Sequence, residues 1–467
     1  MMNTLGICND ETASACMFND GHLIAAVSEE RFSRVKMDSS FPHKSIEYVL
    51  KEAKIGFDQL DSIAYAWSKG FPNDALTAYV NRATELAGQG ISNEFLNERI
   101  RVEIDRDKAK SKEFEEWLEE KSIVNVKKYF HHEAHALSAA LLSPFDECIC
   151  LTADGRGDFE AITTWKFDRS KKSPLNKLSS STSCDSLGFF YGRITGLLGF
   201  KPCRHEGKIT GLAAHGNPYI ALDLMKKMID FDGTSIKANL SDYYKPFYTN
   251  YSDRLKQEIA SHSKEDIAAA AQFHLEDLLK KIVLSTYQEY GINRLPLALA
   301  GGVFGNVKAN QSLKELNCVE NLFVQPQMGD GGLCLGAAAA LQHEKGIKIK
   351  PLQHLYLGPE IKEKDVLEIV ESNSKYEITV PYNLIQEIID ALKDSKVIGL
   401  VRGRMEFGPR ALCHRSIIYK TSDVTANKWL NNRMNRTEFM PFAPVMTSPQ
   451  AKKAFKRILD YIEKNKS

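Results

Sequence analysis

The sequence contains no long apolar run and no excess of either charge. No stretch approaches the roughly 18 consecutive apolar residues that a membrane-spanning helix needs. The N-terminal segment MMNTLGICNDETASACMF lacks the basic start and the unbroken apolar run of a signal peptide. Lys and Arg total 61 against 60 Asp and Glu, so the overall charge favours neither nucleic acid nor an acidic membrane. We therefore expect a cytoplasmic protein with neither a membrane nor a nucleic-acid partner.

Cysteine is sparse and scattered: the chain has 9 in 467 residues, and no two of them form a Cys-x-x-Cys pair. An odd number of dispersed thiols is typical of reduced core residues, which excludes a disulfide framework and a thiolate zinc site. Hydrophobic residues make up 43% and charged residues 26%, as in ordinary globular proteins. At about 150 residues per domain, the length predicts two or three domains.

Two similar strand patterns indicate an internal duplication. The first has strands expected at Thr4–Cys8, Ala13–Phe18 and His22–Ser28, the last two joined by the turn Asn19-Asp20-Gly21. The second has strands at Glu147–Ala153 and Ala161–Phe167, joined by the glycine-rich turn 154–158. The repetition predicts a duplicated α/β fold.

Other segments define the organisation around these strands. Residues 74–121 are charged and have few helix breakers, which predicts a helical insertion outside the sheet. Pro296–Ala300 and Leu322–Gln325 are expected strands that run into glycine turns, with a helix behind the second. A strand, a glycine turn and a helix in succession present backbone N–H groups to phosphate. The charged segment ending at Pro351 predicts a linker, and we place a domain boundary near residue 350.

The pattern HHEAH places two imidazoles on one face of a helix, since His131 and His135 are four residues apart. Asp154 and Asp330 each follow an expected strand and stand beside glycines. Two histidines completed by carboxylates are typical of a divalent metal site. A solvated helix face remains the alternative.

Three further patterns suit anion binding. The turn containing Gly301, Gly302 and Asn306 suits a nucleotide or, equally, a tight strand–helix connection. Lys208 lies in a glycine-containing loop where it can meet phosphate, although such a residue is more commonly a surface lysine. An arginine-rich segment embedded in Gly, Pro and Phe favours bidentate contacts with phosphate or carboxylate. Its arginines are Arg402, Arg404, Arg410, Arg415, Arg433 and Arg436.

Seven motifs occur in a fixed order: SEERFSRVK, HHEAHALSA, GLAAHG, GGVFGNVKAN, MGDGGLCLGAA, GRMEFGPRAL and NRTEFMPFAPV. Together they resemble the NodU/CmcH-type O-carbamoyltransferases, and the resemblance runs from residue 4 to about residue 446. It implies a Kae1-like domain of the actin/Hsp70/sugar-kinase superfamily over residues 1–347. It also implies an incomplete YrdC-like α/β domain over residues 352–467.

The resemblance implies an ATP-dependent reaction. Carbamoyl phosphate and ATP, the latter bound with Mg²⁺, would give carbamoyl adenylate, which a hydroxyl of a sugar or secondary metabolite would attack. By motif, His131, His135, Asp154 and Asp330 would hold a divalent metal such as iron. Lys36 and Lys208 would face phosphate, and Gly301, Gly302 and Asn306 would form the nucleotide turn. The basic stretch would neutralise phosphate through Arg404, Arg410, Arg415, Arg433 and Arg436.

The sequence departs from the family pattern in two places. Glu11 and Thr12 stand where many members have a histidine, so the carboxylate of Glu11 is the expected general base. The segments expected after the PFAP motif are missing, which predicts either that a second polypeptide completes the YrdC-like domain or that the chain is a truncated or diverged form. Three alternatives stay open: a non-catalytic or regulatory pseudoenzyme subunit, a tRNA-modifying relative and a sugar kinase. The sequence does not identify the acceptor.

Overall fold

A computed structural model describes most of the chain, in two compact units. The first unit contains residues 1–379 and 399–417, and the second contains residues 380–398 and 418–467. Within these limits the described residues are 2–67, 70–88, 90, 93–121, 125–239, 243, 252–372, 375, 379–423, 425–434 and 442–464. None of the helices in these ranges combines the length and the apolar composition that crossing a bilayer requires.

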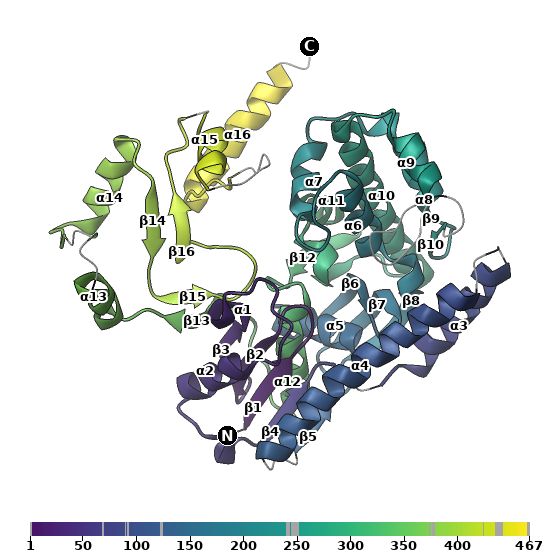
Figure 1. The fold of residues 1–467 in the computed structure, drawn as a ribbon, viewed down its shortest axis with the longest axis horizontal. Coiled ribbons are helices and arrows are strands. Elements are labelled where there is room, and N and C mark those ends of the chain that lie inside the picture. Colours follow the sequence, from purple (N-terminus) through teal and green to yellow (C-terminus); the bar gives the residue numbers. More distant parts are fainter. Residues whose placement is uncertain are drawn as a thin grey trace. The chain divides into compact units, whose positions relative to one another are not determined.

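The first half of the first unit is built on a five-stranded sheet (purple to blue in Figure 1). Its strands are β1 (Asn3–Cys8), β2 (Ser14–Asn19), β3 (His22–Ser28), β4 (Ser62–Tyr65) and β5 (Val126–Lys128). They lie in the order β3-β2-β1-β4-β5, with β1 antiparallel to β2 and parallel to β4. Helices α1 (Glu30–Ser33) and α2 (His43–Ala53) follow β3, and α2 packs on β2 and β3.

The second half repeats this strand order. Its strands are β6 (Glu147–Gly157), β7 (Glu160–Asp168), β8 (Leu175–Thr182), β11 (Leu295–Ala300) and β12 (Val319–Val324). They lie in the order β8-β7-β6-β11-β12, with β6 antiparallel to β7 and parallel to β11. The mixed α/β fold expected from the sequence is therefore confirmed, and the repeated strand order reveals the duplication directly.

Two alanine-rich helices join the halves. Helix α5 (His131–Leu142) follows the first sheet but packs on β6 and β11, whereas α12 (Leu333–Glu344) follows the second sheet but packs on β1 and β2. The two helices also pack against each other. A Cβ atom added at Gly336 would lie 1.9 Å from the carbonyl oxygen of Ala134, so only glycine allows this approach.

Further helices surround the second sheet. They are α6 (Leu187–Leu197), α7 (Glu206–Ala213), α8 (Leu222–Met228), α9 (Asp253–Ile259), α10 (Lys264–Glu289) and α11 (Val307–Lys314). Helix α10 contacts α6, α7, α8 and α11, so it lies at the centre of this group of helices. A short hairpin of β9 (Ile229–Phe231) and β10 (Ile236–Ala238) lies beside α8.

The segment 74–121 contains α3 (Asn73–Gly88) and α4 (Asn93–Lys121), which take no part in either sheet (Figure 1). Helix α3 is anchored by Arg82, whose guanidinium forms a buried ion pair with Asp185 at 3.0 Å. Arg82 also donates to the carbonyl oxygen of Ala238. Because both charges are buried and paired, removing either partner would leave an uncompensated charge.

The C-terminal part of the chain is divided between the units. The first unit includes β13 (Tyr356–Glu360), α13 (Glu363–Glu371), β15 (Arg404–Glu406) and most of β14 (Ile398–Val401) and β16 (Arg415–Ile418). The second unit includes α14 (Leu384–Lys393), α15 (Ala426–Arg433) and α16 (Ser448–Lys464). Strand β13 pairs with β15, and both strands belong to the first unit although both follow the boundary expected near residue 350. The YrdC-like character of residues 352–467 stays a prediction.

Candidate active site

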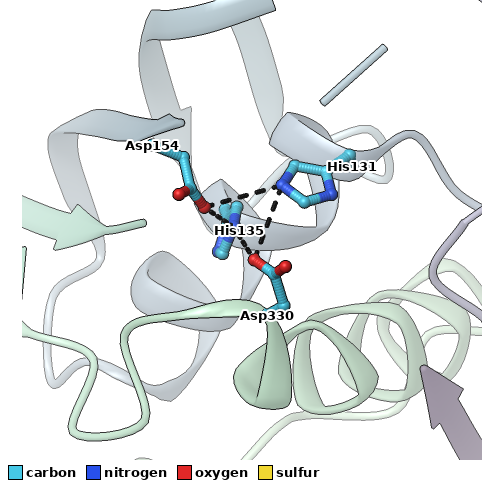
Figure 2. A group of neighbouring side chains, drawn as sticks. All are labelled: His131, His135, Asp154 and Asp330. Atoms are coloured by element: carbon cyan, nitrogen blue, oxygen red, sulfur yellow. Dashed lines mark hydrogen bonds and ion pairs between the residues drawn. The ribbon is translucent and has the colours of Figure 1, made fainter. Parts of the chain in front are cut away.

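Four side chains from three segments meet where α5 and α12 begin. His131 and His135 lie one turn apart on α5 and are fully buried. Asp154 lies in β6, next to the interruption of its pairing with β7, and Asp330 opens the short 3-10 turn before α12. Because α5 packs on both β6 and α12, the two imidazoles and the two carboxylates face a common space (Figure 2).

The distances fit a divalent ion. His135 Nε2 lies 3.0 Å from Asp154 Oδ2 and 3.6 Å from Asp330 Oδ1. His131 Nε2 lies 3.7 and 3.8 Å from the same two oxygens. A tetrahedral ion with ligands at about 2.1 Å has ligand–ligand distances of about 3.4 Å. Among the described residues, neither ring nitrogen of His131 has a hydrogen-bond partner, so a metal would satisfy an otherwise unpaired buried group.

The charges of the four groups are strongly coupled. Burial opposes protonation of His131, but the nearby carboxylates of Asp154 and Asp330 raise its pKa to about 9. Burial likewise opposes ionisation of Asp154, yet the two histidines hold its pKa well below the usual range. Burial and the charge of Asp154 raise the pKa of Asp330. The cluster therefore needs a cation, and a proton on His131 supplies one when no metal does.

The turn between β6 and β7 positions His131. Asp158 Oδ2 accepts a hydrogen bond of 2.5 Å from the backbone N–H of His131, which satisfies a donor at the start of α5. A Cβ atom at Gly157 would lie 2.2 Å from the His131 ring, so the turn packs directly on the imidazole. On another side, the ring of Trp67 meets His131 edge-on, with centroids 5.0 Å apart. No sequence pattern indicates these three contacts with His131, although Gly157 and Asp158 belong to the glycine-rich turn between two of the expected strands.

The expected base, Glu11, lies in the turn between β1 and β2, the counterpart of the β6–β7 turn. Desolvation by the surrounding protein atoms and the charges of Asp330 and Asp10 raise the pKa of Glu11 to about 7. The side chain is nevertheless 47% exposed. Asp10 is buried and pairs with Arg106 of α4. Asp10 and Arg106 were not identified from the sequence, and no spacing pattern links them.

The glycine turn lies directly beside the metal-ligand cluster. Gly301 has φ +104°, and a Cβ atom at Gly302 would lie 3.1 Å from Asp154 Oδ1. Asn306 caps α11, since its Oδ1 accepts a hydrogen bond of 3.1 Å from the Ala309 backbone N–H. Its Nδ2 donates to Gln272 of α10 at 2.7 Å. Asn306 thus fixes the start of the helix behind the glycine turn.

The two lysines lie on different segments of the first unit. Lys36 is exposed, and its carbonyl oxygen accepts a hydrogen bond of 3.1 Å from Arg204. Lys208 is in the first turns of α7, with its ammonium 5.5 Å from the ring centroid of Phe200. The contact of these two lysines with phosphate stays a prediction.

Arg404 and Arg415 direct their guanidinium groups to the backbone. Arg404 donates to the carbonyl oxygens of Ile24 at 3.2 Å and Leu357 at 2.6 Å. Arg415 donates to four carbonyl oxygens at 2.8–3.1 Å. These contacts hold the arginine-rich segment on the first unit.

Arg410 differs from those two arginines because it is exposed and reaches the glycine turn. Its Nη2 donates to the carbonyl oxygen of Gly305 at 3.0 Å. The loop around it is shaped by Glu406, which accepts hydrogen bonds from three backbone N–H groups within residues 412–415. In the second unit, Arg433 is exposed, and Arg436 lies outside the described residues.

Comparison with known proteins decides the family. Residues 4–339 match the family model for the carbamoyltransferase N-terminus, and residues 389–465 match that for the carbamoyltransferase C-terminus. The chain belongs to the carbamoyltransferase family. It is accordingly a transferase, as the motifs indicated.

Relatives of this carbamoyltransferase extend over nearly the whole chain. An uncharacterized protein of Methanocaldococcus jannaschii is 32% identical over 463 residues, covering 95% of this chain and 78% of its own length. Nodulation protein NolNO of Sinorhizobium fredii is 29% identical over 452 residues, covering 95% of this chain and 63% of its own length. Nodulation protein NolO of Bradyrhizobium diazoefficiens is 29% identical and covers 70% of this chain and 59% of its own length.

Solved structures show weaker likeness. Component A of the (R)-2-hydroxyglutaryl-CoA dehydratase of Acidaminococcus fermentans has a TM-score of 0.43 and 16% identity, covering 74% of this chain and 99% of its own. Full-length HypF in a phosphate- and nucleotide-bound form has a TM-score of 0.38 and 13% identity, covering 75% of this chain and 56% of its own. Both TM-scores lie below 0.5, a level at which a likeness does not establish a shared fold.

Proposed function

We propose that this chain transfers a carbamoyl group from carbamoyl phosphate, activated by ATP as carbamoyl adenylate, to a hydroxyl of a sugar or secondary metabolite. The observation that carries the proposal is the adjacency of the metal-ligand cluster and the glycine turn, with Gly302 directly beside Asp154. In this proposal, the reacting carbonyl would lie next to the nucleotide phosphate.

The residues take complementary parts in this proposal. Gly301, Gly302 and the Asn306-capped helix form the nucleotide turn, with Arg410 beside it and Lys36 and Lys208 facing phosphate. Arg404 and Arg415 hold the loop that carries Arg410. A divalent ion, iron or a similar metal, held by His131, His135, Asp154 and Asp330 would supply Lewis-acid charge beside the departing phosphate.

The transfer step needs a proton acceptor. The hydroxyl oxygen bonds to the carbamoyl carbon, the bond from that carbon to the phosphate oxygen breaks, and AMP leaves. Glu11 takes the hydroxyl proton, and its raised pKa makes it a stronger base than an ordinary carboxylate.

Measurements of AMP release, metal content and ATP binding in the unmodified chain and two variants test the proposal. The metal-loaded chain should release AMP from chemically prepared carbamoyl adenylate faster than buffer does, and His131→Ala should lose both this activity and the metal while still binding ATP. Arg410→Gln should bind ATP about tenfold more weakly, as expected for one lost charged contact, and keep its metal. Lys112→Gln, which removes an exposed cation of α4, is the control. Release of AMP at the buffer rate by the metal-loaded chain would contradict the proposal.

A further inference from the structure

One face of the insertion helix α4 (the long blue helix in Figure 1) lies against the β1–β2 turn and the loop before α2. Glu113 accepts hydrogen bonds from Asn9 Nδ2 at 3.1 Å and from the Phe41 backbone N–H at 3.3 Å. One residue later, Phe114 stacks on Tyr65 with centroids 3.8 Å apart and planes at 4°. Helix α4 is thereby fixed over the turn that carries Glu11.

Arg106 lies on the same face, seven residues before Glu113, and reaches the carboxylates of this turn. It pairs with Asp10, and its Nη1 lies 3.9 Å from Glu11 Oε1. Its guanidinium also lies over the ring of Trp67, 5.8 Å from the centroid. Trp67 meets the metal-ligand residue His131 edge-on. Arg106 therefore connects the insertion with both the expected base and the metal-ligand cluster.

The guanidinium of Arg106 is the positive charge that faces several carboxylates around Glu11. Asp10, Asp330 and Asp154 all act on Glu11 with like charge, and Arg106 opposes them. The neighbouring cations of this region have other partners: Lys110 pairs with Glu113, and Arg156 pairs with Glu103. In the described part of the chain, Arg106 is the basic side chain that forms ion pairs with Asp10 and Glu11. Without it, a half-exposed Glu11 would rotate away from the other carboxylates toward solvent.

We propose that Arg106 is a positioning residue for the transfer step, holding the Glu11 carboxylate toward the metal-ligand cluster where the acceptor hydroxyl must lie. The inference rests on the proposed function, in which Glu11 takes the hydroxyl proton as AMP leaves. It also assigns a role to the insertion: α4 forms the wall of the acceptor side of the site. Orientation of a base in this way lowers the barrier of the step without adding a contact to the nucleotide.

The experiment measures AMP release from carbamoyl adenylate by the metal-loaded full chain, with water as the hydroxyl compound. It compares Arg106→Gln and Arg106→Lys with Glu113→Gln, a matched control. Glu113 anchors the same face of α4 to the same turn but touches neither carboxylate. Metal content, melting temperature and binding of 5′-O-sulfamoyladenosine, a stable analogue of the adenylate, are measured for each variant.

Arg106→Gln should lower kcat about tenfold or more, the scale of a misplaced general base, and leave KM within about twofold. Its acidic limb should move to higher pH, because removing the cation raises the pKa of Glu11. Arg106→Lys should recover part of kcat, and Glu113→Gln should match the unmodified chain.

Two results would overturn the assignment of Arg106 alone. The first is an unchanged kcat and pH profile in Arg106→Gln. The second is an equal loss of kcat in Arg106→Gln and Glu113→Gln with lowered melting temperatures, which would make Arg106 a structural anchor only. If the unmodified chain neither binds the analogue nor releases AMP above the buffer rate, the proposed function fails, and the role of Arg106 fails with it.

Discussion

At the scale of single residues, the candidate metal centre is a balance of buried charge. Asp154 and Asp330 are held close to two imidazoles, and no lysine or arginine forms an ion pair with either carboxylate among the described residues. The pKa of His131 is raised to about 9 by this arrangement, so the imidazole is protonated at neutral pH when no metal is bound. A metal must displace that proton, because only the neutral ring coordinates.

We therefore predict that metal affinity rises with pH. Below the raised pKa of His131, each bound ion releases about one proton, and the apparent Kd falls about tenfold per pH unit. The rise should level off near pH 9. Calorimetric titration with Co²⁺ in two buffers of different ionisation enthalpy measures the proton release directly. The titrations cover about pH 6.5 to 8.5, a range below the raised pKa of His131. A metal affinity that stays constant over this range would show that His131 is not a ligand.

At the scale of elements, the site depends on two helices that each cross to the opposite sheet. Helix α5 brings the histidines to Asp154 because it packs on β6, and α12 brings Asp330 because it packs on α5. Alanine and glycine on both helices allow the close contact, and Gly336 sits against the backbone of α5. The stability of this contact and the geometry of the metal ligands are therefore linked.

Substitution of Gly336 by Ala should test that link. The added methyl group meets the carbonyl oxygen of Ala134, a backbone atom that cannot rotate away, so overpacking should lower the unfolding free energy by about 1–3 kcal/mol. Metal affinity should fall as well, because α5 must shift. Gly207→Ala in α7 is the matched control, since its new Cβ atom meets nothing within 4 Å. Denaturant unfolding and metal titration give the two readouts, and equal behaviour of both variants would contradict the prediction.

At the scale of the whole molecule, the chain consists of a large unit that carries the candidate site and a smaller second unit. Helix α14 of the second unit leaves Leu384 and Ile385 59% and 72% exposed. Exposed apolar side chains in a group favour association. The second polypeptide expected from the sequence stays a prediction, and this surface is where we expect it to bind.

This expectation has a kinetic consequence. This chain alone should release little pyrophosphate from ATP and carbamoyl phosphate, while the predicted second polypeptide, carrying the YrdC-like segments that follow the PFAP motif in the family, should restore the release. Replacing Leu384 and Ile385 together by Gln should reduce the pyrophosphate release that the second polypeptide restores. Lys112→Gln, at an exposed position of α4, is the control. Rapid pyrophosphate release by the isolated chain would show that it forms carbamoyl adenylate unaided.

Much of the fold follows from local patterns in the sequence. The strands β1, β2, β3, β6, β7, β11 and β12 match the expected alternation and turns within a few residues. The His131–His135 spacing predicted a helix with both rings on one face, and α5 confirms it. In contrast, no sequence pattern singled out α10, because its buried residues surround most of its circumference and leave no single apolar stripe.

The sequence alone therefore determined most of the strands, the duplication and the resemblance to the family, since these depend on spacing and on motifs within short segments. Only the tertiary structure decided which arginines lie partly buried against backbone carbonyl oxygens, as Arg404 does. It likewise decided that Arg410 stays exposed while donating to the carbonyl oxygen of Gly305. It also decided that Arg106 meets Asp10 across 96 residues of chain. Such partners are selected by the packing of α4 on the β1–β2 turn, and a contact between distant segments leaves no periodic trace in the sequence.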